Sequence, residues 1–244
     1  MIDVRPILDE PPLHMSFSPG TSDRLVVSFA GVGNNRRQVP PVEFARLSHW
    51  NGQNNVLYVS DLSRSWMNGP GIAEAVVEAV QGIGARLKLS EIVAIGNSMG
   101  GTAALILASL MKVDRVVALV PQFSVHPEVI PGEWRWTHFR DKIAQWRFRE
   151  SPDLRETGTS VTILHGGSKD ELMHAERFPK DAGYRHFIFP HEGHNLARSL
   201  HDRGLLSPIV TLSMLGRFPR ARRAIRTAGG VSRRRFDQTP IRTL

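Results

Sequence analysis

The chain has 244 residues, of which 41 % are hydrophobic and 22 % charged, as expected for one globular domain. It contains no cysteine, which excludes disulfide bonds, a thiol nucleophile and a thiolate zinc site. Residues 1–6 show no basic-then-apolar leader pattern, and no apolar run reaches the roughly 18 residues that span a bilayer. These features predict a cytoplasmic protein without a transmembrane segment.

The net charge of +8 is concentrated at the C-terminal end. Residues 217–244 contain nine arginines and one acidic residue, Asp237, so this segment accounts for the whole excess of positive charge. The rest of the chain is formally neutral. We therefore predict one main domain over residues 1–204, followed by a C-terminal helix and basic tail over residues 205–244.

Apolar, β-branched segments alternate with helical patterns along the chain. In chain order we expect strands at 24–30, 55–60, 91–95, 114–120, 160–164 and 184–189, and helices at 41–50, 71–89, 98–111, 171–181 and 195–202. Strands that are uniformly apolar are buried on both sides. The alternation therefore predicts an α/β fold, with a mainly parallel sheet and helices on both faces.

One interval, residues 121–158, interrupts this alternation after the fourth predicted strand. It is rich in Pro and Trp and contains one helical pattern, at 137–149. We expect a small insertion that forms a lid.

The strongest motif is Gly96-Asn-Ser-Met-Gly100, which matches G-x-S-x-G between a predicted strand and a predicted helix. Such a turn is so sharp that Ser98 must adopt a strained backbone conformation. Side chains at positions 96 and 100 would collide with the neighbouring backbone, and glycine at both positions avoids this collision. The start of the helix also directs backbone N–H groups at the place where an oxyanion develops. Ser98 is the predicted nucleophile.

With this motif in this context, residues 26–201 resemble the α/β-hydrolase superfamily. The resemblance implies the chain order nucleophile, acid, base. The sequence His165-Gly-Gly-Ser-Lys-Asp170 resembles the family's Gly-x-x-Asp turn, which implies Asp170 as the acid, with Glu171 as the alternative. The turn ending in Gly193-His194 resembles the one that carries the base, which implies His194, with His191 as the alternative.

The resemblance also implies an oxyanion hole made of two backbone N–H groups. One belongs to Met99, directly after the nucleophile. The second follows the first predicted strand, where the alignment of Ala30-Gly31 with the family's usual His-Gly implies Val32. No metal and no organic cofactor is needed for this chemistry.

Polar side chains follow several predicted strands, at the edge where parallel sheets bind ligands. We predict substrate contacts from four of them: Arg64, Trp66, Asn68 and Gln122. Amide groups and an indole face suit a polar or sugar-bearing ester. The alternative is that these four residues are ordinary solvent-exposed loop residues without a role in binding.

Together these patterns predict a serine hydrolase of the carboxylesterase or deacylase type, acting on a small-molecule or glycan ester. A thioesterase or small-peptide hydrolase would use the same residues. The rival hypothesis is a catalytically silent α/β-hydrolase scaffold that acts as a glycan- or protein-binding accessory protein, since a fold does not fix a function.

The C-terminal segment admits two interpretations. In the first, its arginines contact an anionic surface such as lipid, nucleic acid or acidic glycan. The favoured interpretation is a helix packed through Ile209, Leu212 and Leu215, followed by a solvated end that is separable from catalysis.

Overall fold

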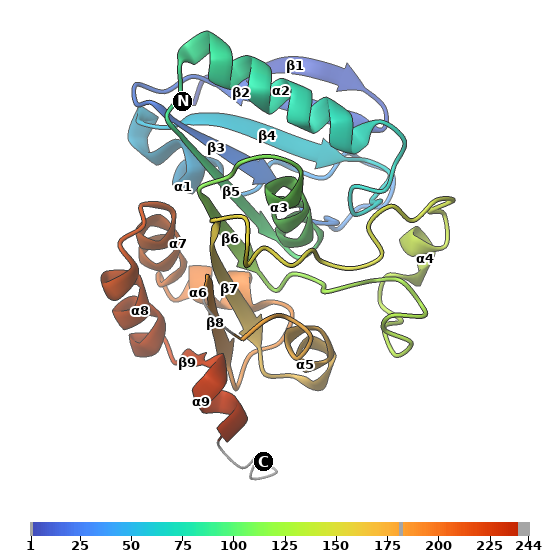
Figure 1. The fold of residues 1–244 in the computed structure, drawn as a ribbon, viewed down its shortest axis with the longest axis vertical. Helices are drawn as coiled ribbons and strands as arrows, with labels where there is room; N and C mark the ends of the chain where they lie inside the picture. Colours follow the sequence, from blue (N-terminus) through green and yellow to red (C-terminus); the bar gives the residue numbers. More distant parts are fainter. Residues whose placement is uncertain (1, 181–182, 239–244) are drawn as a thin grey trace.

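The computed structural model describes residues 2–180 and 183–238. Within them a nine-stranded sheet has the order β1-β2-β4-β3-β5-β6-β7-β8-β9 (Figure 1). The strands are β1 (Arg5–Glu10), β2 (Leu13–Ser18), β3 (Arg24–Phe29), β4 (Asn55–Asp61), β5 (Glu91–Asn97), β6 (Arg115–Leu119), β7 (Ser160–Gly166), β8 (Tyr184–Phe189) and β9 (Val231–Ser232). The strands from β4 to β8 in that order pair in parallel. The β1–β2, β2–β4 and β8–β9 pairs are antiparallel.

Helices cover both faces of this sheet. They are α1 (Ala45–His49), η1 (Trp50–Gly52), α2 (Ile72–Leu87), α3 (Met99–Leu110), α4 (Thr137–Arg140), α5 (Lys169–Ala175), α6 (Leu196–Asp202), α7 (Leu206–Met214), α8 (Phe218–Thr227) and α9 (Arg233–Gln238). The apolar sides of α2 and α3 form one core with the sheet, and those of α6, α7 and α8 form another on the opposite face. None of the helices described is long and apolar enough to cross a membrane.

The predicted mainly parallel α/β sheet is confirmed. The six expected strands correspond to β3 through β8, because their uniformly apolar sequences are buried on both faces. The predicted helix at 171–181 is shorter and earlier, at Lys169–Ala175, and Asp181 lies outside the described residues. The N-terminal hairpin of β1 and β2 was not among the predicted elements.

The insertion over residues 121–158 is mostly irregular, and its helical part is restricted to α4. The predicted helix at 137–149 is therefore too long. Phe139 is buried in a small apolar cluster with Val32, Trp66 and Met99, and Trp136 packs against the same cluster. The insertion thus lies against the loops that follow β3 and β4 and against the start of α3.

The C-terminal segment differs from the prediction of a solvated end, because residues 217–238 are folded onto the domain. Ala221 and Ile225 of α8 are buried, and β9 pairs with β8 through Phe187–Ser232 and Ile188–Val231. This segment occupies the edge of the sheet opposite β1 (Figure 1). It is part of the same sheet and not an appendage to a domain ending at residue 204. Arg242 lies outside the described residues.

Candidate active site

Ser98 lies in the turn between β5 and α3 with φ 56° and ψ −123°, a conformation that residues with side chains rarely adopt. The flanking glycines make this turn sterically feasible. A Cβ at Gly96 would lie 2.1 Å from the carbonyl carbon of Gly100, and one at Gly100 would lie 2.4 Å from the carbonyl oxygen of Phe29. The strain expected from the G-x-S-x-G sequence is therefore present at Ser98.

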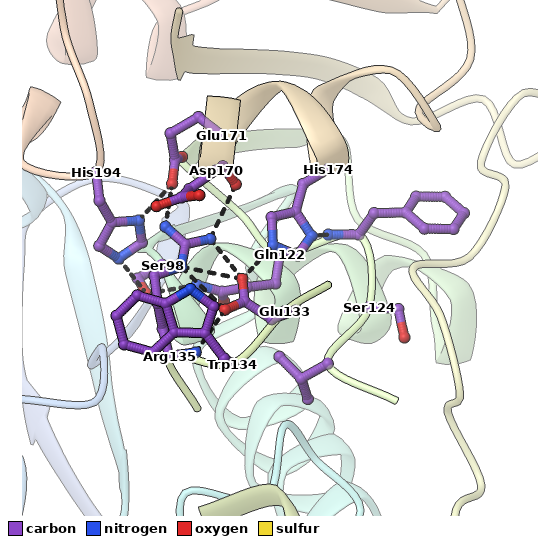
Figure 2. Close-up of polar contacts among 12 residues, drawn as sticks. Ser98, Gln122, Ser124, Glu133, Trp134, Arg135, Asp170, Glu171, His174 and His194 are labelled. Atoms are coloured by element: carbon purple, nitrogen blue, oxygen red, sulfur yellow. Dashed lines mark hydrogen bonds and ion pairs between the residues drawn. The ribbon is translucent and has the colours of Figure 1, made fainter. Parts of the chain in front are cut away.

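His194 and Glu171 complete a hydrogen-bonded series with Ser98 (Figure 2). The Oγ of Ser98 lies 3.0 Å from Nε2 of His194, and Nδ1 of His194 lies 2.9 Å from Oε1 of Glu171. The predicted base, His194, is thus in contact with the predicted nucleophile. The alternative base, His191, is exposed.

The acid is a correction to the sequence-based choice, because Glu171 and not Asp170 contacts His194. Since α5 begins at Lys169, residues 170 and 171 already lie on a helix and their side chains point in directions about 100° apart. The side chain of Glu171 is directed at His194. Asp170 contributes its backbone carbonyl, which accepts a hydrogen bond from Nη2 of Arg135 at 3.0 Å.

The turn that precedes α5 and the loop that carries His194 are held together by their backbones. The N–H of Gly167 donates to the carbonyl oxygens of Phe189 and Glu192 at 2.8 and 2.9 Å. A Cβ at Gly167 would lie 2.6 Å from the carbonyl oxygen of Pro190. Only a glycine permits this approach, which fixes the distance between the two loops.

Glu171 is 1 % exposed and is shared between two donors. Its Oε1 accepts from His194 and also from Nη1 of Arg135, at 2.7 Å. Burial alone would raise the pKa of Glu171, but the hydrogen bond and charge of His194 and the hydrogen bond from Arg135 lower it to about 2. Glu171 is therefore ionised at neutral pH.

A second buried carboxylate extends this network. Both carboxylate oxygens of Glu133 accept from Nε of Arg135 at 3.0 Å, and one of them lies 2.7 Å from Nε2 of His174. Burial raises the pKa of Glu133, while hydrogen bonds from His174 and Arg135 outweigh it and lower the pKa to about 2. Nδ1 of His174 accepts from the N–H of Phe123 at 3.2 Å, so Nε2 carries the proton that bonds Glu133.

Sequence reasoning did not include Glu133, Arg135 or His174 in the site. Glu133 and Arg135 belong to the irregular insertion, where no motif marks them, and they reach α5 only in the folded chain. Through Arg135 the insertion is anchored directly on the acid.

No family model and no curated protein matches this sequence. Solved structures resemble its fold. The capsule O-acetyltransferase of Neisseria meningitidis serogroup A superposes with a TM-score of 0.56 at 11 % identity, covering 83 % of this chain and 93 % of that one. MPT51 of Mycobacterium tuberculosis superposes with a TM-score of 0.60 at 10 % identity, covering 88 % of this chain and 100 % of that one. An esterase of Pyrococcus furiosus superposes with a TM-score of 0.55 at 12 % identity, covering 83 % of this chain and 88 % of that one.

The protein has the α/β-hydrolase fold. At these identities the likeness shows the fold alone, so the roles of individual residues must be argued from the geometry of this protein.

Gln122 is the one predicted substrate-binding side chain that contacts the nucleophile. Its Nε2 donates to Oγ of Ser98 at 2.8 Å, and its Oε1 accepts from Nε1 of Trp66 at 3.0 Å. Gln122 follows β6 and Val120, whose φ of 42° is strained for a β-branched residue. The turn after β6 thus directs this amide at Ser98, and the buried Trp66 fixes its orientation.

Three predicted substrate contacts are instead used inside the protein. Arg64 is fully buried and donates to the backbone carbonyls of Val32, Leu62, Asn35 and Gln38. Asn68 joins the loop after β4 to the insertion, because it both donates to and accepts from the backbone of Phe148. With Trp66 bonded to Gln122, these side chains shape the site and are not free to bind substrate.

The two residues predicted as oxyanion donors lie at the start of α3 and after β3. Met99 is the first residue of α3, where backbone N–H groups have no partner within the helix. Val32 follows β3 and is buried, and its carbonyl is held by Arg64 at 3.1 Å. Next to it, the N–H of Gly31 donates to Oε1 of Glu43 at 3.2 Å.

Trp136 covers the base. Its ring lies 5.3 Å from the imidazole of His194 and 6.1 Å from the ring of Trp66. Three buried polar atoms near the site have no hydrogen-bond partner among the residues described: Oδ1 of Asn97, Nε1 of Trp136 and Oε2 of Glu171. Within the same ranges, no group of three or more His, Asp or Glu side chains is arranged to hold a metal ion.

Proposed function

We propose that this protein is a serine hydrolase that cleaves a carboxylic ester through an acyl-enzyme on Ser98. The observation that carries the proposal is the series Ser98–His194–Glu171, with contacts of 3.0 and 2.9 Å, on a strained strand-to-helix turn. This is the arrangement that activates a hydroxyl toward acyl transfer.

In the first half-reaction, Oγ of Ser98 attacks the ester carbonyl and its proton passes to Nε2 of His194. Glu171 holds Nδ1 and stabilises the imidazolium charge, and the N–H groups of Met99 and Val32 bind the oxyanion. His194 then returns the proton to the departing alcohol. In the second half-reaction a water molecule attacks the acyl carbon while His194 accepts one of its protons. The bond between the acyl carbon and Oγ of Ser98 then breaks, His194 returns the proton to Oγ, and the carboxylic acid leaves.

Gln122 has a distinct part in this scheme. Its amide donates to one lone pair of the Ser98 Oγ, and the hydroxyl proton of Ser98 is directed to His194. The second lone pair of Oγ stays available for attack on the substrate. We propose Gln122 as a residue that positions the nucleophile. This is a narrower role than the substrate contact expected from the sequence.

The proposed substrate class rests on the side chain that covers the site. Trp136 lies beside His194 and its indole N–H has no partner among the described residues, so we propose that this N–H bonds a polar group of the substrate. A polar ester, including an acylated sugar, fits this donor. Arg64, Trp66 and Asn68 are buried and bonded inside the protein, so they do not support the proposal of sugar binding.

The test is hydrolysis of a panel of aryl esters, acylated sugars and acyl thioesters by the native protein and by Ser98→Ala. The native protein should release the acid from at least one member, and Ser98→Ala should lose about a thousandfold or more, as is usual for a missing nucleophile. Trp136→Phe should preferentially reduce turnover of hydroxyl-bearing esters. Equal turnover by native protein and Ser98→Ala would contradict the proposal and favour the silent scaffold.

A further inference from the structure

A second cavity lies at the far edge of the sheet and shares no lining residue with the site around Ser98. Its volume is about 630 Å³, within the range of small-ligand sites. It is bounded by the beginning of β8, by α8 and by the start of α9. β9 pairs only with Phe187 and Ile188, so the first residues of β8 face this cavity.

The lining is strongly basic. Six of the residues that line it are cationic: Lys180, Arg185, Arg222, Arg226, Arg233 and Arg234. The described lining includes no Asp or Glu. One carboxylate nearby, Asp237, pairs with Lys180 at 2.8 Å and with Arg233 at 2.6 Å. No carboxylate among the described residues forms an ion pair with the other four cations of this lining.

Two of these cations are held in place before any ligand arrives. Arg233 is 3 % exposed and donates to Asp237 and to the carbonyl of Ala175. Arg185 donates to Oγ of Ser160 at 2.5 Å, and its guanidinium lies 3.5 Å from the centre of the Phe218 ring. A cavity built from fixed guanidinium groups is preorganised for anions.

Helix α8 separates its arginines between two sides. Arg222 and Arg226, four residues apart, line this cavity, whereas Arg220 and Arg223 line a shallow hollow beside Leu205 and Pro208. Like charges at this spacing repel each other. Burial and the nearby Arg222 also lower the pKa of Arg185.

One buried histidine among the residues that line the cavity has a ring nitrogen without a partner. His186 is 5 % exposed, its Nε2 lies 2.9 Å from Nδ1 of His165, and its Nδ1 bonds none of the described residues. His165 in turn contacts the carbonyl of Pro121 through Nε2, at 2.9 Å, so Nε2 carries its proton and Nδ1 accepts from His186. Nδ1 of His186 is thus left as an acceptor without a donor among the described residues.

We propose that this cavity binds a compact ligand with two or more phosphate groups. The cations are spread over α8, α9 and β8, so a single phosphate would reach only some of them, whereas a diphosphate spans more. Guanidinium groups bind phosphate oxygens in pairs, and a phosphate group carries more negative charge and more acceptor oxygens than a carboxylate, which favours phosphate. The inference does not rest on the esterase activity.

Titration calorimetry with inorganic pyrophosphate and inorganic monophosphate tests the proposal. The native protein should bind pyrophosphate saturably and more tightly than monophosphate, and binding should weaken as sodium chloride is raised. The double variant Arg222→Gln/Arg226→Gln should lose at least about tenfold in affinity, since it removes two charge-assisted contacts. Parallel titrations with ADP and with vesicles carrying a lipid diphosphate distinguish a soluble from a lipid-borne source.

The matched control is Arg220→Gln/Arg223→Gln, which removes the same charge from the same helix on its other side. It should retain pyrophosphate affinity within about threefold. Equal losses in the two double variants, or no saturable binding of pyrophosphate, would overturn the proposal. Ester turnover should be unchanged in both variants, so failure here is distinguishable from failure of the proposed hydrolase.

Discussion

At the scale of single residues, the site depends on which of two adjacent acids faces the base. Sequence comparison with the family turn indicates Asp170, but the position of a helix start decides the matter, and the sequence does not specify it to one residue. Because α5 begins at Lys169, Glu171 reaches His194. Ser98 was predictable because its strand-to-helix turn is sterically restricted at Gly96 and Gly100, and His194 because the turn ending in Gly193-His194 resembles the family's turn for the base.

The assignment of the acid can be tested with two conservative variants. Glu171→Gln keeps the shape of the side chain but removes the charge that stabilises the imidazolium, so kcat should fall by at least about a hundredfold. Asp170→Asn should keep kcat within about threefold, because its side chain has no part in the series. Steady-state kinetics on one ester substrate measures both, and the reverse ranking would restore Asp170 as the acid.

Gln122 allows a similar test. Gln122→Met has nearly the same length but has no N–H to donate to Ser98, so kcat should drop about tenfold while the fold is retained. Gln122→Glu should be lower still, because a carboxylate beside Oγ opposes the oxyanion. An unchanged kcat in Gln122→Met would show that this contact is irrelevant to turnover.

Glu43 gives a prediction for stability against pH. Burial raises its pKa from 4.5 to about 7, although the hydrogen bond from Gly31 opposes this shift. The folded protein therefore binds the proton more tightly than the unfolded chain, and the stability from this group is full below pH 4.5 and lost as pH rises through about 7.

Glu43→Gln keeps an oxygen for the N–H of Gly31 but cannot ionise. Denaturant unfolding should show the variant more stable than the native protein at about pH 8.5 and similar to it at about pH 4.5. A native protein that is the more stable of the two at the higher pH would contradict a buried, neutral Glu43.

At the scale of elements, the insertion after β6 covers the site and is bonded to Glu171 through Arg135. Its irregular backbone gave no sequence pattern beyond Pro and Trp content, so Glu133 and Arg135 could not be predicted. Their positions depend on contacts with α5, more than 30 residues further along the chain.

Removing the charge of Arg135 should therefore be costly. Arg135→Met removes the guanidinium that two buried carboxylates share and leaves them only the contacts with His194 and His174, so it should lower the free energy of unfolding by about 3 kcal/mol. The control Arg198→Met removes an exposed pair with Asp202 and should cost less than about 1 kcal/mol. Similar values for the two variants in denaturant unfolding would show that the buried network adds little.

At the scale of the whole molecule, the parallel sheet was predictable because buried strands and amphipathic helices have distinct apolar periods. The edges of the sheet were not. β1 is largely exposed and β9 is two residues long, so neither has the apolar run that indicated the central strands. The arginine-rich segment was misjudged because α8 buries only small areas, at Ala221 and Ile225, between its arginines.

The folded end of the chain changes what truncation should do. Removing residues 217–244 deletes α8 and β9, exposes Phe189 and frees the carbonyl of Ala175 that Arg233 binds. We expect the shortened protein to melt at a lower temperature, by at least about 5 °C. Unchanged melting would support the separable tail that the sequence suggested.

The central claim is that Ser98 is a nucleophile activated by His194, and labelling with a fluorophosphonate tests it most directly. Intact-mass spectrometry of the native protein should show one adduct, mapped to Ser98 by peptide analysis. Ser98→Ala should take up none, and His194→Ala should react at least about a hundredfold more slowly. An unlabelled native protein, or labelling that persists in Ser98→Ala, would contradict the account.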